Sequence, residues 1–170
     1  MKSIHEKILS GKIFIYPTDT IYGLGCNAMD KRAVNKIKEI KKRDKNKPLS
    51  IIAPSLSWIK RYCVIDSDLK RYFPGPYTVV LKKKNFNFLK WISSSDSLGI
   101  RIPDNSFTKK IQKSKLPFVT TSVNLSGQKQ ITKISEIPEE IRKKADIIID
   151  KGELSGRPST LVINGKEIKR

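Results

Sequence analysis

Short apolar runs alternate along this chain with longer stretches in which apolar residues recur every three or four positions. The short runs predict strands at residues 13–16, 49–53, 77–81, 98–102, 117–121, 145–149 and 160–163. The longer periodic stretches predict helices at residues 30–43, 55–62, 67–73, 105–113 and 138–145, the first with Asp30 as its N-cap. Asn164 and Gly165 then predict a tight hairpin leading into residues 166–169. Interleaved strands and helices indicate an α/β domain around one twisted sheet, and the final hairpin indicates that the sheet is mixed.

The 170 residues are most simply one domain spanning residues 1–170, because no repeat, low-complexity stretch or linker divides them. No apolar run approaches the roughly 20 residues that a membrane helix needs, and the N-terminus lacks the apolar core of a signal peptide. We therefore expect a cytoplasmic protein without a membrane partner. Cys26 and Cys63 lack paired spacing, so reduced thiols are expected rather than a disulfide or zinc site. The only histidine, His5, argues against a histidine-rich metal centre and a Ser-His-Asp triad.

The net charge of +19 allows two interpretations. It could attract a polyanionic partner, with an affinity that falls as salt rises. It could also reflect compositional bias, because the cations are mainly lysine and are spread along the chain. Charge alone favours neither interpretation.

The segment at residues 16–25 follows the first predicted strand and combines hydroxyl groups, a carboxylate and two glycines. Pro17 fixes its own φ, and the glycines tolerate backbone angles that other residues avoid. A strand that ends in such a loop commonly presents hydroxyl and backbone N–H groups to a ligand. We interpret the segment as a ligand loop; the alternative is a polar turn whose glycines only reverse the chain.

Two further segments place cations beside predicted elements. Lys41 and Arg43 end the helix predicted over residues 30–43, where cations complement the helix dipole, but they could also converge on an anion. Arg101 lies inside an alternating strand, and a buried arginine needs a partner. A carboxylate or phosphate ligand could be that partner, and so could an internal aspartate or glutamate.

A fourth segment, residues 120–127, carries hydroxyl and amide groups at the end of a strand. If the strand continues, Ser122 and Asn124 point the same way, and Ser126 with Gly127 ends the pattern. These groups suit hydrogen bonds to phosphate or ribose, although simple turn chemistry also explains them. The sequence contains no P-loop, complete Rossmann fingerprint or dense carboxylate cluster. A nucleotide enzyme of this kind would neutralise phosphates with Lys, Arg and a Mg²⁺ carried by the ligand.

Six stretches in order carry a resemblance to a known family: residues 16–25, Lys41-x-Arg43 with Pro48-Leu49, residues 74–78, residues 99–103, Ser122-x-Asn124 with Ser126-Gly127, and residues 158–160. Together they span nearly the whole chain and resemble the YrdC-like (TsaC-type) threonylcarbamoyl-AMP synthases. The resemblance implies a mixed α/β fold with a deep basic cavity. It also implies an enzyme that converts L-threonine, bicarbonate and ATP into threonylcarbamoyl-AMP and pyrophosphate. A downstream tRNA threonylcarbamoyl transferase complex would then modify the adenosine next to the anticodon.

The same resemblance implies roles for individual residues. The residues expected to bind threonine are Thr20, Arg101, Thr120 and Ser159, with Arg101 clamping the carboxylate. The residues expected to bind ATP are Lys41, Arg43, Lys47, Ser122, Asn124 and Arg170. Lys41 and Arg43 would be catalytic, because fixed cations stabilise the charge that develops when N-carboxythreonine attacks the α-phosphorus. No side chain is expected to bind a metal directly, since Mg²⁺ would be bound through the ATP phosphates.

Two positions depart from the family pattern, and two other functions stay open. Asp19 stands where glutamate is more usual, and Asp44 stands where proline is common, so Asp44 either pairs with a nearby cation or points away. A non-catalytic RNA-binding or ribosome-maturation module would use the +19 charge, and direct tRNA contact is possible for the synthase too. A carbamoyl-transfer domain of hydrogenase maturation proteins would carry further domains and zinc motifs, which this sequence lacks.

Overall fold

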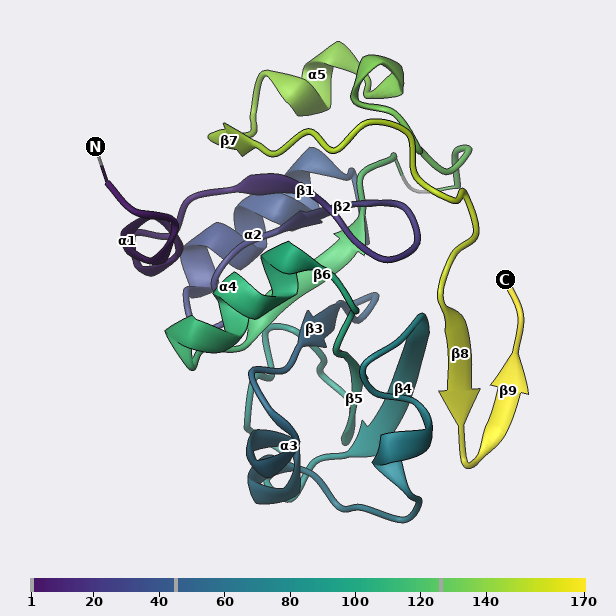
Figure 1. The fold of residues 1–170 in the computed structure, drawn as a ribbon. Coiled ribbons are helices and arrows are strands. Elements are labelled where there is room, and N and C mark those ends of the chain that lie inside the picture. Colours follow the sequence, from purple (N-terminus) through teal and green to yellow (C-terminus); the bar gives the residue numbers. More distant parts are fainter. Residues whose placement is uncertain (1, 45, 126) are drawn as a thin grey trace.

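The computed structural model describes residues 2–44, 46–125 and 127–170. Within these residues the strands form one sheet in the order β7-β1-β2-β6-β3-β5-β4-β8-β9 (Figure 1). The pairs β1–β7, β3–β5 and β4–β8 are parallel, and the other neighbours are antiparallel. The strands are β1 (Phe14–Pro17), β2 (Tyr22–Gly25), β3 (Ser50–Ile52), β4 (Tyr77–Lys82), β5 (Ser97–Arg101), β6 (Phe118–Ser122), β7 (Ile147–Ile148), β8 (Thr160–Ile163) and β9 (Lys166–Ile168). The predicted α/β class with a mixed sheet is confirmed.

Three of the predicted helices, those over residues 30–43, 67–73 and 138–145, are shorter in the structure, while those over 55–62 and 105–113 are confirmed within one residue at each end. The helices are α1 (Ile4–Leu9), α2 (Lys31–Ile40), α3 (Leu56–Tyr62), α4 (Ser106–Ser114) and α5 (Glu139–Arg142), with 3₁₀ helices η1 (Leu69–Arg71) and η2 (Ile134–Glu136). Asp30 caps α2 as predicted, because its side chain accepts the N–H groups of Arg32 and Ala33. Lys41 is the C-cap, and Lys42 has a positive φ of 49°, which ends α2 before Arg43. The helices predicted over residues 67–73 and 138–145 are reduced to η1 and α5.

Helices cover both faces of the sheet around β1. In Figure 1, α2 lies behind β1 and β2, while α1 and α4 lie on the opposite side. Ile15 belongs to the larger apolar core together with Ile37 of α2. Phe14 belongs to a smaller core with Phe107 of α4 and Phe118 of β6. Both faces of β1 are therefore buried, which explains why its sequence is continuously apolar rather than alternating.

The prediction of a ten-residue ligand loop at residues 16–25 was wrong in extent. Residues 22–25 form β2, which pairs antiparallel with β1, so the turn itself comprises only residues 18–21. Gly23 and Gly25 do not adopt the positive φ angles that would require glycine. A side chain at Gly25 would collide with the backbone carbonyl of Val119, and one at Gly23 would press on the ring of Tyr16. These glycines permit close packing of β2 against its neighbours, which local sequence cannot reveal.

Candidate active site

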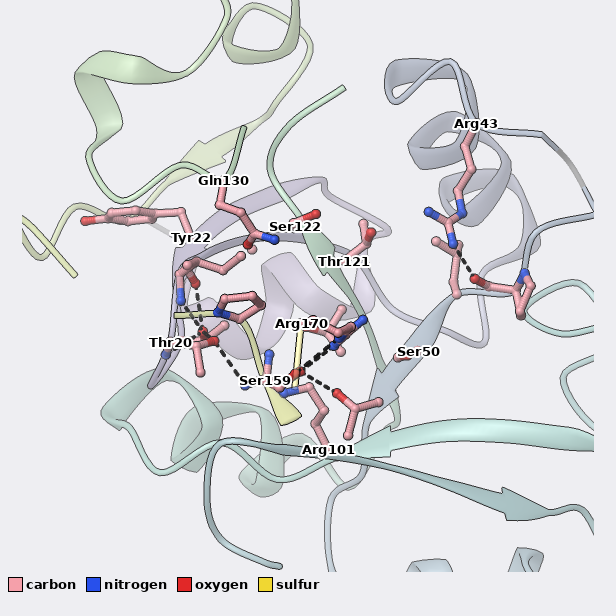
Figure 2. A pocket seen from close by; sticks show the side chains of 18 residues that line it. Thr20, Tyr22, Arg43, Ser50, Arg101, Thr121, Ser122, Gln130, Ser159 and Arg170 are labelled. Atoms are coloured by element: carbon pink, nitrogen blue, oxygen red, sulfur yellow. Dashed lines mark hydrogen bonds between the residues drawn. The ribbon is translucent and has the colours of Figure 1, made fainter. Parts of the chain in front are cut away.

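A cavity of about 180 Å³ lies where the β1–β2 turn meets β6, the end of β5 and the chain entering β8 (Figure 2). Among the residues that the structure describes, its lining includes Arg43, Arg101 and Arg170 and no aspartate or glutamate. Hydroxyl-bearing residues from several strands supply most of the remaining polar surface. The lining is therefore basic and rich in hydrogen-bond donors, as an anion site requires. The depth implied by the resemblance stays a prediction.

The β1–β2 turn is organised by the hydroxyl of Thr18. This oxygen accepts the backbone N–H groups of Thr20 at 3.1 Å and Ile21 at 3.2 Å, and donates to the Ile21 carbonyl at 2.7 Å. It also lies 2.8 Å from Thr20 Oγ1. A side chain that bonds its own following backbone locks such a turn. Thr20 is thereby held with its hydroxyl at the cavity wall.

Arg101 ends β5, and its guanidinium is buried beside this turn. Its NH2 nitrogen donates to Asp19 Oδ1 at 2.8 Å and to Thr20 Oγ1 at 3.3 Å. The internal carboxylate that the sequence left open as a partner is therefore Asp19. Burial lowers the pKa of Arg101, while the nearby carboxylate of Asp19 acts in the opposite direction. Arginine stays charged under such shifts, so the cavity holds a fixed cation here.

Ser159 is fixed from two sides at another wall of the cavity. Its Oγ lies 2.7 Å from Thr78 Oγ1 and accepts a hydrogen bond from Arg170 NH2, also at 2.7 Å. Arg170 Nε also donates to the Ser159 carbonyl at 3.2 Å. Figure 2 shows Arg170 and Ser159 converging above Arg101. The chain after β9 thus returns to the cavity and brings a second arginine to it.

Lys41 and Arg43 flank the positive-φ residue that ends α2, and they take different positions. Arg43 lines the cavity, where its NH2 group donates to the Pro48 carbonyl at 2.8 Å and its buried Nε has no partner in the described chain. Lys41 is almost fully buried, and its Nζ donates to the carbonyls of Ser122 and Asn124, the latter at 2.7 Å. Burial, with a smaller contribution from Arg43, lowers the pKa of Lys41 to about 7.

Ser122 and Asn124 lie together as predicted, although β6 ends at Ser122. Ser122 Oγ donates to Asn124 Oδ1 at 2.6 Å, and Asn124 Nδ2 donates to the Gln128 carbonyl at 2.6 Å. The Lys41 ammonium lies within 3.3 Å of the same Asn124 Oδ1. Asn124 therefore holds the turn after β6 in shape. The predicted contribution of Ser126 lies outside the described residues.

The structure brings most of the predicted site residues to one cavity. Those that line it are Thr20, Arg43, Arg101, Thr120, Ser122, Ser159 and Arg170. Lys41 and Asn124 are buried but do not line it, and Lys47 is exposed and does not line it either. Asp44 is exposed, and its carboxylate accepts the Asn46 N–H at 2.9 Å in a local turn. The individual roles of all these residues stay predictions.

Sequence reasoning missed several lining residues. Thr18 and Thr78 lie in segments that were singled out, but nothing in the sequence marked them as the groups that orient Thr20 and Ser159. Gln130 carried no signal at all; it lines the cavity, and its Oε1 is buried without a partner among the described residues. An unpaired buried acceptor costs free energy unless a donor reaches it, and the described chain supplies none to this oxygen.

In residues 2–44, 46–125 and 127–170, no group of three His, Cys, Asp or Glu side chains is placed to hold a metal ion. Over the same residues, no helix combines the length and the apolar character needed to cross a bilayer.

Known proteins with similar sequences and structures agree on one family. The Sua5/YciO/YrdC family model, described as telomere recombination, matches residues 6–169. A relative from Methanocaldococcus jannaschii, provisionally named threonylcarbamoyl-AMP synthase, is 39% identical over 95% of this chain and 79% of its own length. The threonylcarbamoyl-AMP synthase of Blochmanniella pennsylvanica is 31% identical, with 99% of this chain and 92% of the relative covered.

Among solved structures, the Sua5 protein of Pyrococcus abyssi, crystallised with L-threonine, superposes with a TM-score of 0.83 and 33% identity. The match covers 93% of this chain but only 48% of that protein. The cavity described above therefore sits in a fold that a threonine-binding relative shares. From the sequence, the fold and these matches together, the chain belongs to the Sua5/YciO/YrdC family.

Proposed function

We propose that this protein is a threonylcarbamoyl-AMP synthase, a nucleotidyltransferase that uses L-threonine, bicarbonate and ATP. One observation carries the proposal: Arg43, Arg101 and Arg170 reach a single cavity from three distant parts of the chain, and no described lining residue is acidic. A threonine carboxylate and an ATP triphosphate are both anions, so they need separate fixed cations within reach of each other. Relatives named for this reaction cover nearly the whole chain.

The threonine would bind beside the β1–β2 turn. Arg101 would hold its carboxylate, and the hydroxyl groups of Thr20, Thr120 and Ser159 would contact the rest of the molecule. Threonine bound to the P. abyssi relative supports this substrate. All four side chains are less than a tenth exposed, so little water would compete for these hydrogen bonds.

The nucleotide would occupy the side of the cavity formed by Arg43 and Ser122. At about 180 Å³ the cavity is smaller than ligand pockets usually are, at roughly 300–1,000 Å³. However, it shares Thr20, Pro158 and Arg170 with an adjoining cavity of about 560 Å³. The two spaces together offer room for an amino acid and a nucleotide side by side.

The chain's own groups would position the substrates and stabilise charge rather than move protons. Arg43 would contact phosphate oxygens directly and stabilise the charge that develops at the α-phosphorus. Lys41 would act through the turn at Ser122 and Asn124, whose carbonyls it holds. Mg²⁺ would arrive as part of the substrate, on the ATP phosphates, because the described cavity lining offers no carboxylate to hold it.

The test is pyrophosphate release from ATP by the purified protein. We expect release that requires L-threonine and bicarbonate together, and formation of threonylcarbamoyl-AMP in the same mixture. The Lys41→Ala/Arg43→Ala variant should lose this activity, whereas Lys31→Ala, which removes an exposed cation from α2, should retain it. Full activity in the double variant would show that the proposed site is wrong.

We further propose that the product passes to a tRNA threonylcarbamoyl transferase complex in the cytoplasm. The net charge of +19 is compatible with direct contact to tRNA during this step. If tRNA instead binds tightly at low salt and no adenylate forms under any condition, the RNA-binding module is the better assignment. Adenylate formation that tRNA does not affect would support the synthase without direct tRNA contact.

A further inference from the structure

Among the described residues that contact the buried Arg101 guanidinium, Asp19 is the only acidic one. The Asp19 side chain is 12% exposed and that of Arg101 is 8% exposed, so the pair is largely shielded from water. Asp19 lies on the side of the adjoining cavity and does not line the cavity that holds the three arginines. The carboxylate therefore pairs with Arg101 from outside the cavity that the three arginines line.

Both oxygens of Asp19 are engaged. Oδ1 accepts from Arg101 NH2 at 2.8 Å, and Oδ2 accepts the backbone N–H of Asp104 at 3.0 Å. Asp104 follows β5, and Asp19 belongs to the turn between β1 and β2. The carboxylate thus links the β1–β2 turn to the guanidinium of Arg101 and to the backbone that follows β5. Asp19 therefore contacts the guanidinium through Oδ1, while Oδ2 holds the backbone after β5.

This arrangement leaves part of the guanidinium open. Arg101 NH2 has acceptors for both of its hydrogens, namely Asp19 Oδ1 and Thr20 Oγ1. Arg101 Nε is buried and has no hydrogen-bond partner in the described chain. A buried cationic N–H without an acceptor costs free energy. The guanidinium is planar, so fixing NH2 also fixes the direction of its other N–H groups.

We propose that Asp19 is a positioning residue, which orients the Arg101 guanidinium so that its remaining N–H groups face the cavity and bind the carboxylate of the amino-acid substrate. This inference rests on the proposed binding of threonine by Arg101. Asp19 would also hold the cation in place when the site is empty, so that binding does not have to order it. Its contribution would therefore appear in threonine binding and much less in ATP binding.

The experiment compares Asp19→Asn, Asp19→Ala and Asp19→Glu with the intact protein in the pyrophosphate assay. Asn keeps the size of the side chain but removes the charge, and it cannot accept from both Arg101 and the Asp104 N–H. We expect it to raise the KM for threonine about tenfold, with the KM for ATP changed by less than about twofold. Ala should raise the threonine KM at least as much, and Glu should recover part of the loss because it keeps the carboxylate.

Controls separate positioning from folding and from the proposed function. Asp66→Asn removes an exposed carboxylate far from the cavity lining and should leave both KM values unchanged. Melting temperatures and ATP binding show whether each variant is folded. Should Asp19→Asn raise both KM values equally, or leave the threonine KM unchanged while Arg101→Ala raises it, the positioning role is wrong and the synthase proposal stands. Normal threonine binding by Arg101→Ala would overturn both the positioning role of Asp19 and the binding of threonine by Arg101.

Discussion

The buried side chain of Lys41 should make the free energy of unfolding depend measurably on pH. Burial lowers the pKa of Lys41 from 10.5 to about 7, and this amounts to roughly 5 kcal/mol against the charged form in the folded state. The unfolded chain keeps the proton up to its ordinary pKa, while the folded chain releases it near pH 7. Between these pH values the unfolded state binds more protons. This residue's contribution to the free energy of unfolding must therefore rise with pH.

Lys41→Met tests this reasoning because methionine keeps an unbranched apolar body and cannot titrate. The substitution leaves the carbonyls of Ser122 and Asn124 without their donor, which costs about 1–3 kcal/mol for each acceptor that finds no water. That loss does not depend on pH. The free energy of unfolding of the intact protein, relative to the variant, should increase by about 2 kcal/mol between about pH 7 and pH 9.

Urea unfolding curves of both proteins, recorded at intervals from about pH 6 to pH 9, measure this difference. Groups that titrate equally in both proteins cancel in the subtraction. Lys31→Met removes an exposed ammonium from the same helix and is the matched control. The reasoning is refuted if the curves for the intact protein and Lys41→Met stay parallel over the whole range.

Three further predictions follow from the packing and the cavity. Arg43→Ala should lower kcat/KM for ATP by about 10–100-fold without changing the melting temperature, because it removes a cation from the cavity wall; Arg32→Ala on the exposed side of α2 is the control. Gly25→Ala should destabilise the fold by about 1–3 kcal/mol in urea, since its methyl group would meet a β6 carbonyl; a melting curve identical to that of the intact protein would contradict this packing. Cys26 and Cys63 are free and buried, with raised pKa values, so a thiol reagent should label them only after urea unfolds the chain.

Most of the elements could be predicted from the sequence in their correct order, because they depend on local periodicity or local chemistry. The helix beginning after Asp30 required only a capping carboxylate and apolar residues near one face. The hairpin between β8 and β9 required only Asn164 and Gly165, both of which adopt positive φ angles. These features survive in the structure because they need no information from distant residues.

Helix ends and the second strand could not be predicted in the same way. The end of α2 is set by the positive φ of Lys42, and no glycine marks that position in the sequence. The strand β2 was hidden because Gly23 and Gly25 are typical of turns. Their actual role is to admit the ring of Tyr16 and the backbone of β6, which only the pairing of strands brings close.

The sequence by itself determined the fold class and named seven of the residues that line the cavity, including its three arginines, because these residues lie in recognisable segments at the ends of strands and helices. Only the tertiary structure decided how the charges among them are paired. It buried Lys41 against the carbonyls of Ser122 and Asn124, and it paired Arg101 with Asp19. The physical reason is that a buried charge pairs with the acceptors that folding brings within hydrogen-bond distance. The order of residues along the chain does not give these distances.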